Sequence, residues 1–192
     1  MIAATAPVAL LGQAIAFTCD ALALADSVAP TVPTPCRGWA LGDLLDHMAD
    51  GLDAFTEASN GLVAVTPVAH TGIALLDVRA KARALLSAWQ QAPTEAVRIA
   101  DVEVGSDVLL HAAALEITVH GWDVAVAVSA AGAGAGAGPR IPTLLALDLM
   151  PAAHLLLRDA DRTGRFAAPV PVAPDAPAGV RLLALLGRTA CS

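Results

Sequence analysis

Apolar residues recur every three or four positions over most of the chain, which is the spacing of an amphipathic helix. Leu41, Leu44, Leu45, Met48 and Leu52, for example, would form one apolar face. The same pattern predicts helices over about residues 8–28, 40–59, 72–91, 107–129 and 143–161, and a short sixth helix over 180–188.

The segments between these helices have other patterns. Residues 95–105 alternate apolar and polar side chains, which predicts a short extended hairpin. Alternating glycine and alanine over 130–139 indicates a flexible loop, and the proline-rich segment 166–178 indicates an extended connector. We therefore expect one all-α domain over residues 1–192, a four-helix bundle with long connections, a hairpin near 95–105 and a C-terminal extension.

Composition narrows the class of protein. Hydrophobic residues make up 56% of the chain, but alanine supplies much of that share, and after the first helix no uncharged apolar run reaches the ~18 residues of a membrane span. The N-terminal segment lacks the basic start of a signal peptide, because the first positive charge is Arg37. A net charge of −7 argues against nucleic acid. We expect a cytoplasmic protein with neither a membrane nor a nucleic-acid partner.

The polar residues of the stretch LEITVHGWDVAVA (115–127) are the strongest chemical signal. Glu116, His120 and Asp123 fall close to one line, because positions four and seven apart differ by only ~40° and ~20° around a helix. His47 lies midway along the predicted second helix, between Leu44 and Met48.

If the second and fourth helices pack together, His47, Glu116 and His120 converge as three ligands for a divalent metal ion. Zinc would accept this set with an open position, and iron(II) or nickel would also fit. Spacing alone leaves the alternative open that these are capped or core histidines, because Glu-x-x-x-His is common by chance.

Two stretches carry a resemblance to a known family. TPCRGWALGDLLDHMADGLDAF (34–55), followed later by LEITVHGWDVAVA, resembles the DinB-like metal-binding bundle. The match is specifically to the mycothiol-dependent maleylpyruvate isomerase N-terminal domain and its single-domain relatives. The resemblance implies that His47, Glu116 and His120 are the metal ligands. The tail over 166–188 is similar to the C-terminal segment of the single-domain relatives.

The resemblance also implies a chemistry. The expected partners are a small electrophilic substrate and a low-molecular-weight thiol, mycothiol, with transfer or isomerisation as the reaction. Two departures stand out: Ala40 replaces the Thr or Ser that caps the second helix in the family, and the chain is too short for the second domain of the isomerase. The second departure argues against maleylpyruvate itself.

Two other functions remain open alternatives. One is a metalloenzyme of specialised metabolism that uses no thiol. The other is a metal-binding or dimerisation module without turnover, in which an apolar helix face would pair with a second copy of the chain.

Four further residues have other expected roles. We expect Asp123 to orient a ligand histidine or to form a salt bridge. Cys36 is expected to be a small packing residue, His154 a core or rim histidine, and Arg188 a surface ion-pair partner or an anion contact.

Overall fold

The structure is a computed structural model that describes residues 5–63, 75–91, 94–133, 139–157 and 166–189. Its elements, in chain order, are α1 (Pro7–Ala25), α2 (Leu41–Ala58), β1 (Leu62–Val63), α3 (Leu75–Gln91), β2 (Ala96–Ile99), β3 (Val102–Gly105), α4 (Ser106–Ala130), α5 (Thr143–Leu156) and α6 (Ala178–Leu185). The predominantly helical fold expected from the sequence is confirmed.

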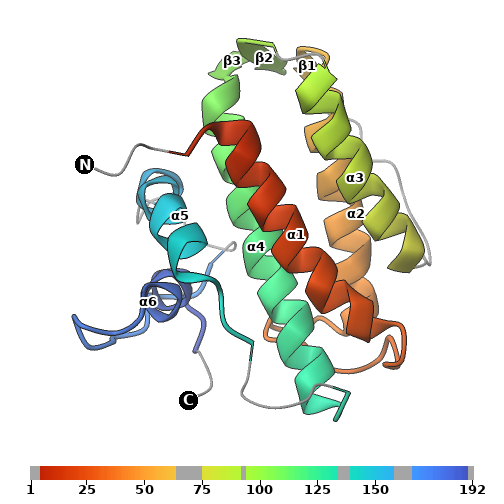
Figure 1. Ribbon diagram of the computed structural model, residues 1–192, viewed down its shortest axis with the longest axis vertical. Helices are drawn as coiled ribbons and strands as arrows, with labels where there is room; N and C mark the ends of the chain where they lie inside the picture. Colours follow the sequence, from red (N-terminus) through yellow and green to blue (C-terminus); the bar gives the residue numbers. More distant parts are fainter. Residues whose placement is uncertain (1–4, 64–74, 92–93, 134–138, 158–165, 190–192) are drawn as a thin grey trace.

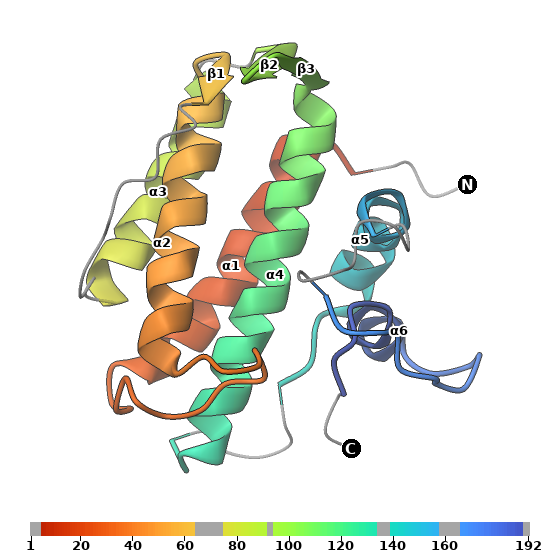
Figure 2. The same ribbon diagram turned by 180° about the vertical axis from the view of Figure 1, so that it is seen from behind.

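Helices α1 to α4 form a four-helix bundle, with α1 and α2 each packed against both α3 and α4 (Figures 1 and 2). The α1–α4 contact is the tightest, because Gly121 lets the two backbones approach. A Cβ atom at position 121 would lie 2.3 Å from Thr18 Oγ1 and 3.1 Å from Thr18 Cα. The Thr18 hydroxyl donates a hydrogen bond to the carbonyl oxygen of Ile117 at 2.8 Å, so α1 also bonds to α4 at this point.

A small sheet covers one end of the bundle (Figure 1). Strands β2 and β3 form the hairpin predicted near residues 95–105, with Val97 opposite Val104. Ala100, in the two-residue turn, has a φ of 51°, a region that favours glycine or asparagine. Strand β1 pairs in parallel with β2, and the hydrophobic pattern did not predict it. Its two residues are too few to produce a periodic signal.

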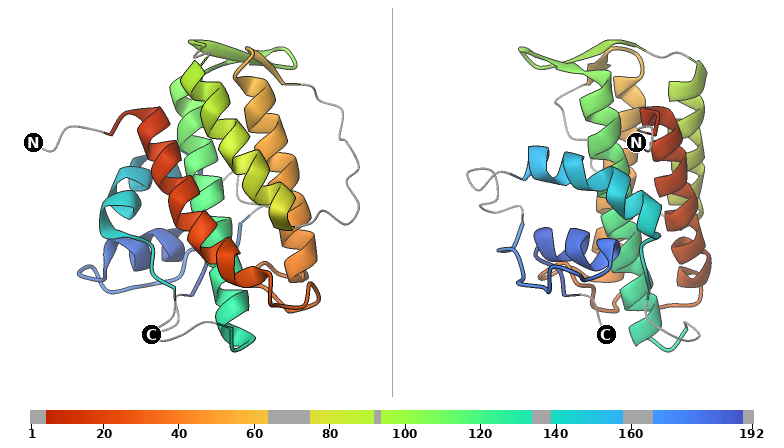
Figure 3. Two further views of the ribbon diagram at one scale, coloured as in Figure 1. Left: turned by 45° about the vertical axis from the view of Figure 1, so that its right-hand side comes forward. Right: turned by 60° about the vertical axis from the view of Figure 1, so that its left-hand side comes forward.

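Helices α5 and α6 lie together on the side of the bundle formed by α4 (Figure 3). Gly187 ends α6 with a φ of 76°. Its N–H donates to the carbonyl of Ala184, and the N–H of Arg188 donates to the carbonyl of Leu183, which together make a Schellman cap. The cap reverses the chain and directs it back toward α4.

The predicted helix limits hold to within a few residues, with one larger difference. The fifth helix ends at Leu156 instead of near residue 161, and residues 158–165 lie outside the described part. So do 134–138 of the Gly/Ala segment. Residues 166–177 have no regular secondary structure, as their prolines predicted. Among the described residues, α1 alone has the length and apolar character of a membrane span, a test that buried core helices also pass.

Candidate metal centre

The packing of α2 against α4 brings His47, Glu116 and His120 together. Glu116 Oε1 lies 3.5 Å from His47 Nε2 and 3.6 Å from His120 Nε2, and the three ligand-type atoms all lie within 4.8 Å of one another. Ligands ~2.0–2.2 Å from a tetrahedral zinc ion are ~3.3–3.6 Å apart. Both distances from Glu116 therefore match the spacing around a zinc-sized ion.

The electrostatics of the cluster favour a cation beside Glu116. Burial alone would raise the pKa of its carboxyl group, but the hydrogen bonds and charges of His120 and His47 outweigh burial and hold the pKa well below its ordinary value. Glu116 is therefore anionic at neutral pH. Burial would likewise lower the pKa of His120, yet Asp123, Cys36 and Glu116 raise it well above 6.5.

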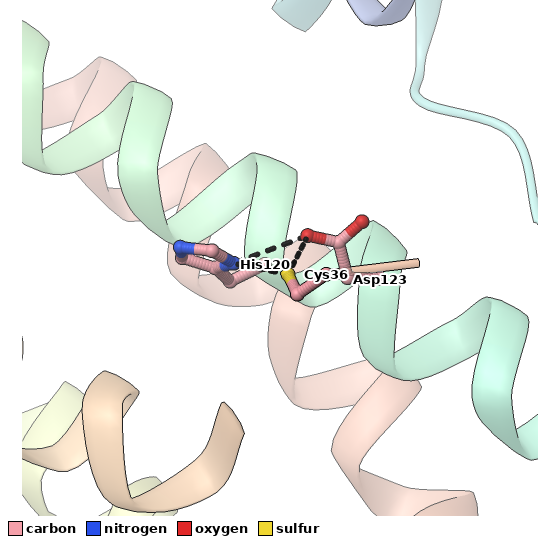
Figure 4. Close-up of side chains that lie close together, drawn as sticks. All are labelled: Cys36, His120 and Asp123. Atoms are coloured by element: carbon pink, nitrogen blue, oxygen red, sulfur yellow. Dashed lines mark hydrogen bonds and ion pairs between the residues drawn. The ribbon is translucent and has the colours of Figure 1, made fainter. Parts of the chain in front are cut away.

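The Nδ1 nitrogen of the His120 ring contacts a buried carboxylate. Asp123 Oδ2 lies 3.1 Å from His120 Nδ1, and the Asp123 side chain is completely buried. Figure 4 shows Nδ1 directed at Asp123 and Cys36 while the second ring nitrogen points away from them. With the Nδ1 proton held by Asp123, Nε2 is the nitrogen that would exchange its proton for an ion, and this orienting role is the usual one for a carboxylate behind a metal-binding histidine.

Arg188 completes this support from the C-terminal segment. Its Nε and Nη2 atoms donate to the two carboxylate oxygens of Asp123 at 3.1 and 2.7 Å. Burial would raise the pKa of Asp123, but His120 and Arg188 outweigh it and lower the pKa. The Asp123 carboxylate is thus buried as an anion with its counter-ion in place.

Cys36 joins the same cluster from the connector before α2. Its thiol donates to Asp123 Oδ2 at 3.2 Å, and its sulfur lies 3.8 Å from His120 Nδ1. Cys36, His120 and Asp123 thereby form a second group with metal-ligand chemistry. The guanidinium of Arg188 already occupies both Asp123 oxygens and lies 3.7 Å from the Cys36 sulfur. A metal ion there would have to displace that cation, so the first group is the better candidate.

Two cavities meet at His47, Glu116 and His120. The first, the outer groove, has a volume of about 650 Å³ and lies between the connector 35–39, α4 and the C-terminal residues 166–167 and 186–188. The second, the inner cavity, is a partly open hollow lined by residues of α1, α2, α3 and α4, and has about 20 Å³ of room for water. The cluster thus borders both a groove large enough for a small molecule and a small, mainly apolar hollow.

The sequence predicted some of these contacts and missed others. The convergence of the three predicted ligand residues and the contact of Asp123 with a ligand histidine are both present in the structure. Cys36 was expected only to pack, and Arg188 only to form a surface contact or bind an anion, yet both contact buried Asp123. No local signal marks Arg188, because it lies 65 residues from its partner.

The remaining histidines stay away from the cluster where the structure describes them. His111 Nδ1 lies 2.6 Å from the carbonyl oxygen of Asp107, in its own helix. His154 is exposed on α5, which corrects the expectation of a core or rim position. His70 and Cys191 lie outside the described residues.

A four-helix bundle with ligand-type side chains on facing helices is an architecture that builds metal sites in its core. The chain belongs to the family described as the Mycothiol maleylpyruvate isomerase N-terminal domain, whose model matches residues 11–125. The match begins within α1, ends within α4 and includes the three candidate ligands, whereas α5, α6 and Arg188 lie beyond it. No curated protein matches the chain.

Proposed function

We propose that His47, Glu116 and His120 bind a divalent metal ion and that the protein is an enzyme. It would use a low-molecular-weight thiol, mycothiol, for transfer or isomerisation on a small electrophile. Zinc is the expected ion, because two imidazoles and one carboxylate are a common catalytic zinc set, and nickel or iron(II) are the alternatives.

One observation carries the proposal. Three candidate ligand atoms from two helices lie together in the lining of an open groove, and the ring of His120 is already oriented by the buried pair of Asp123 and Arg188. Three protein ligands leave a coordination position for a small molecule, which distinguishes a catalytic site from a closed structural one. The family relationship supports the thiol as the cosubstrate.

The ion, Glu116, Asp123 and the outer groove have separate roles in the proposed chemistry. A bound divalent ion lowers the pKa of a coordinated water or thiol, so that the anion exists at neutral pH. Glu116 neutralises part of the ion's charge and, as a ligand, is not free to act as a general base. Asp123 holds the Nδ1 proton of His120, and the outer groove admits the thiol and the electrophile together.

Elemental analysis of the purified protein tests the metal. We expect about one zinc per chain, lost in the His47→Ala variant. His154→Ala is the matched control, because that histidine is exposed on α5. A protein without stoichiometric metal, or a His47→Ala variant that keeps it, would refute the site.

A second assay tests the thiol. Consumption of a general electrophile is followed with the metal-loaded protein, with and without mycothiol. We expect turnover only with the thiol. Turnover that needs no thiol would favour the alternative metalloenzyme, and a tightly held ion with no turnover of any electrophile would favour the non-catalytic module.

A further inference from the structure

The inner cavity is a feature that the proposed function does not use. The three candidate ligands form part of its lining, and its walls come from four helices. Apart from His47, Glu116 and His120 at its mouth and Thr18 in α1, the lining is apolar: Leu22, Met48, Leu52, Phe55, Val78 and Ile117 form most of it.

An apolar lining of this kind offers few hydrogen-bond partners to a water molecule. A buried water needs about 10–15 Å³ of room and two to four polar partners. The inner cavity has about 20 Å³, so room is not the obstacle. The hydroxyl of Thr18, however, already donates its hydrogen to Ile117, and the walls beyond the mouth are carbon. An apolar group of similar size would fit without leaving a polar atom unpaired.

Gly51 is one of the residues that line the inner cavity. It lies in the interior of α2, one turn after His47, where glycine is a poor helix former. A Cβ atom at this position would meet nothing within 4 Å, so close packing does not require glycine here. Gly121 is the contrast, since a Cβ there would collide with α1. Because the space around position 51 is open, a larger side chain there has room to reach the cavity that Gly51 lines.

We propose that the inner cavity is the subsite for a short apolar substituent of the electrophile, while the larger outer groove takes the thiol. This inference rests on the proposed metal site, because the reacting end of the electrophile would lie at His47, Glu116 and His120. It names a substrate class: small electrophiles with a methyl or short alkyl group next to the reacting end.

The first experiment probes the cavity without any metal. Xenon is titrated into the metal-free protein while the methyl resonances are recorded by ¹³C NMR. We expect saturable shifts at Leu52, Val78 and Ile117. Gly51→Leu should abolish them, and the matched variant Gly51→Ala should keep them. Shifts confined to the outer groove, or no saturable shifts, would overturn the inference.

The second experiment uses the cobalt(II)-loaded protein and straight-chain carboxylates from acetate to pentanoate, followed by the visible spectrum of the ion. Affinity should rise about fourfold for each methylene until the cavity is full. The rise should persist in Gly51→Ala and in Phe166→Ala, a change in the outer groove, and disappear in Gly51→Leu. Equal affinity along the series would overturn the inference.

A third variant enlarges the cavity instead of filling it, and it keeps the test valid if Gly51→Leu does not fold. Val78→Ala enlarges the inner cavity from α3, so the most tightly bound carboxylate should become longer. An unchanged optimum would count against the subsite. If the protein binds no cobalt, the proposed metal site fails, and the xenon titration still decides whether the cavity accepts an apolar guest.

Discussion

At the scale of single residues, Asp123 links the C-terminal segment to the candidate ligand His120. Asp123→Asn keeps the shape of the side chain but removes the charge that faces both His120 and Arg188. We expect zinc affinity to fall about 10- to 100-fold, as for other carboxylates behind metal-binding histidines. Competition with a chromophoric chelator measures this.

The matched control for that variant is Asp107→Asn in the first turn of the same helix, α4. Its side chain contacts the backbone N–H of Val108 and lies away from the cluster, so zinc affinity should be unchanged. Equal affinities for the two variants would show that Asp123 does not support the site.

Cys19 gives a prediction about pH. Burial raises the pKa of its thiol and outweighs the opposing charges of Arg83 and Arg79. The folded state therefore holds the thiol proton more tightly than the unfolded state does. The resulting contribution to stability is present below the unfolded pKa and is lost as the pH rises through the folded pKa.

Iodoacetamide labelling with peptide mapping tests this shift, because only the thiolate reacts. The midpoint of the labelling rate at Cys19 should lie at higher pH in the folded protein than in urea. A midpoint that is the same or lower in the folded protein would contradict the role of burial.

At the scale of elements, the start of α2 lacks half of a capping box. Asp43 Oδ2 accepts a hydrogen bond from the N–H of Ala40 at 2.9 Å, but Ala40 offers no side-chain oxygen in return. Ala40→Ser should complete the box and raise the free energy of unfolding by about 1 kcal/mol. Urea denaturation measures the change. Ala54→Ser, inside the same helix, should not stabilise, because serine is a weaker helix former than alanine.

The surroundings of two glycines in the bundle predict opposite effects on stability when each is replaced by alanine. Gly121→Ala forces α1 away from α4 and should lower the free energy of unfolding by about 1–3 kcal/mol. Gly51→Ala meets nothing and should raise it by up to about 1 kcal/mol. Thermal and urea unfolding of the pair check both signs. A Gly121→Ala variant as stable as the parent would contradict the close α1–α4 approach.

The bounds of the long helices could be read from apolar periodicity, because each helix has to bury one face. Strand β1 could not, since its two residues are ordered by pairing with β2. Gly187 is a local signal in the sequence for the end of α6, where the structure has a Schellman cap. Nothing local indicates what Arg188 contacts.

At the scale of the whole molecule, a bound ion would join α2 to α4. Binding to the folded state alone raises the free energy of unfolding by about 2.7 kcal/mol when the free metal is 100 times its Kd. We expect zinc to raise Tm, EDTA to reverse the rise, and His47→Ala to remove it. A similar rise in His47→Ala would place the ion elsewhere.

The sequence by itself determined the helices, the hairpin and the three candidate ligands, because these depend on spacing along the chain or on two short motifs. Tertiary structure decided what surrounds the ligands. Arg188, Asp123 and Cys36 meet only after α6 has packed beside the bundle, and the inner cavity exists only between four helices. Spacing along one helix is a local property, whereas burial, counter-ions and cavities depend on contacts between segments that are distant in the chain.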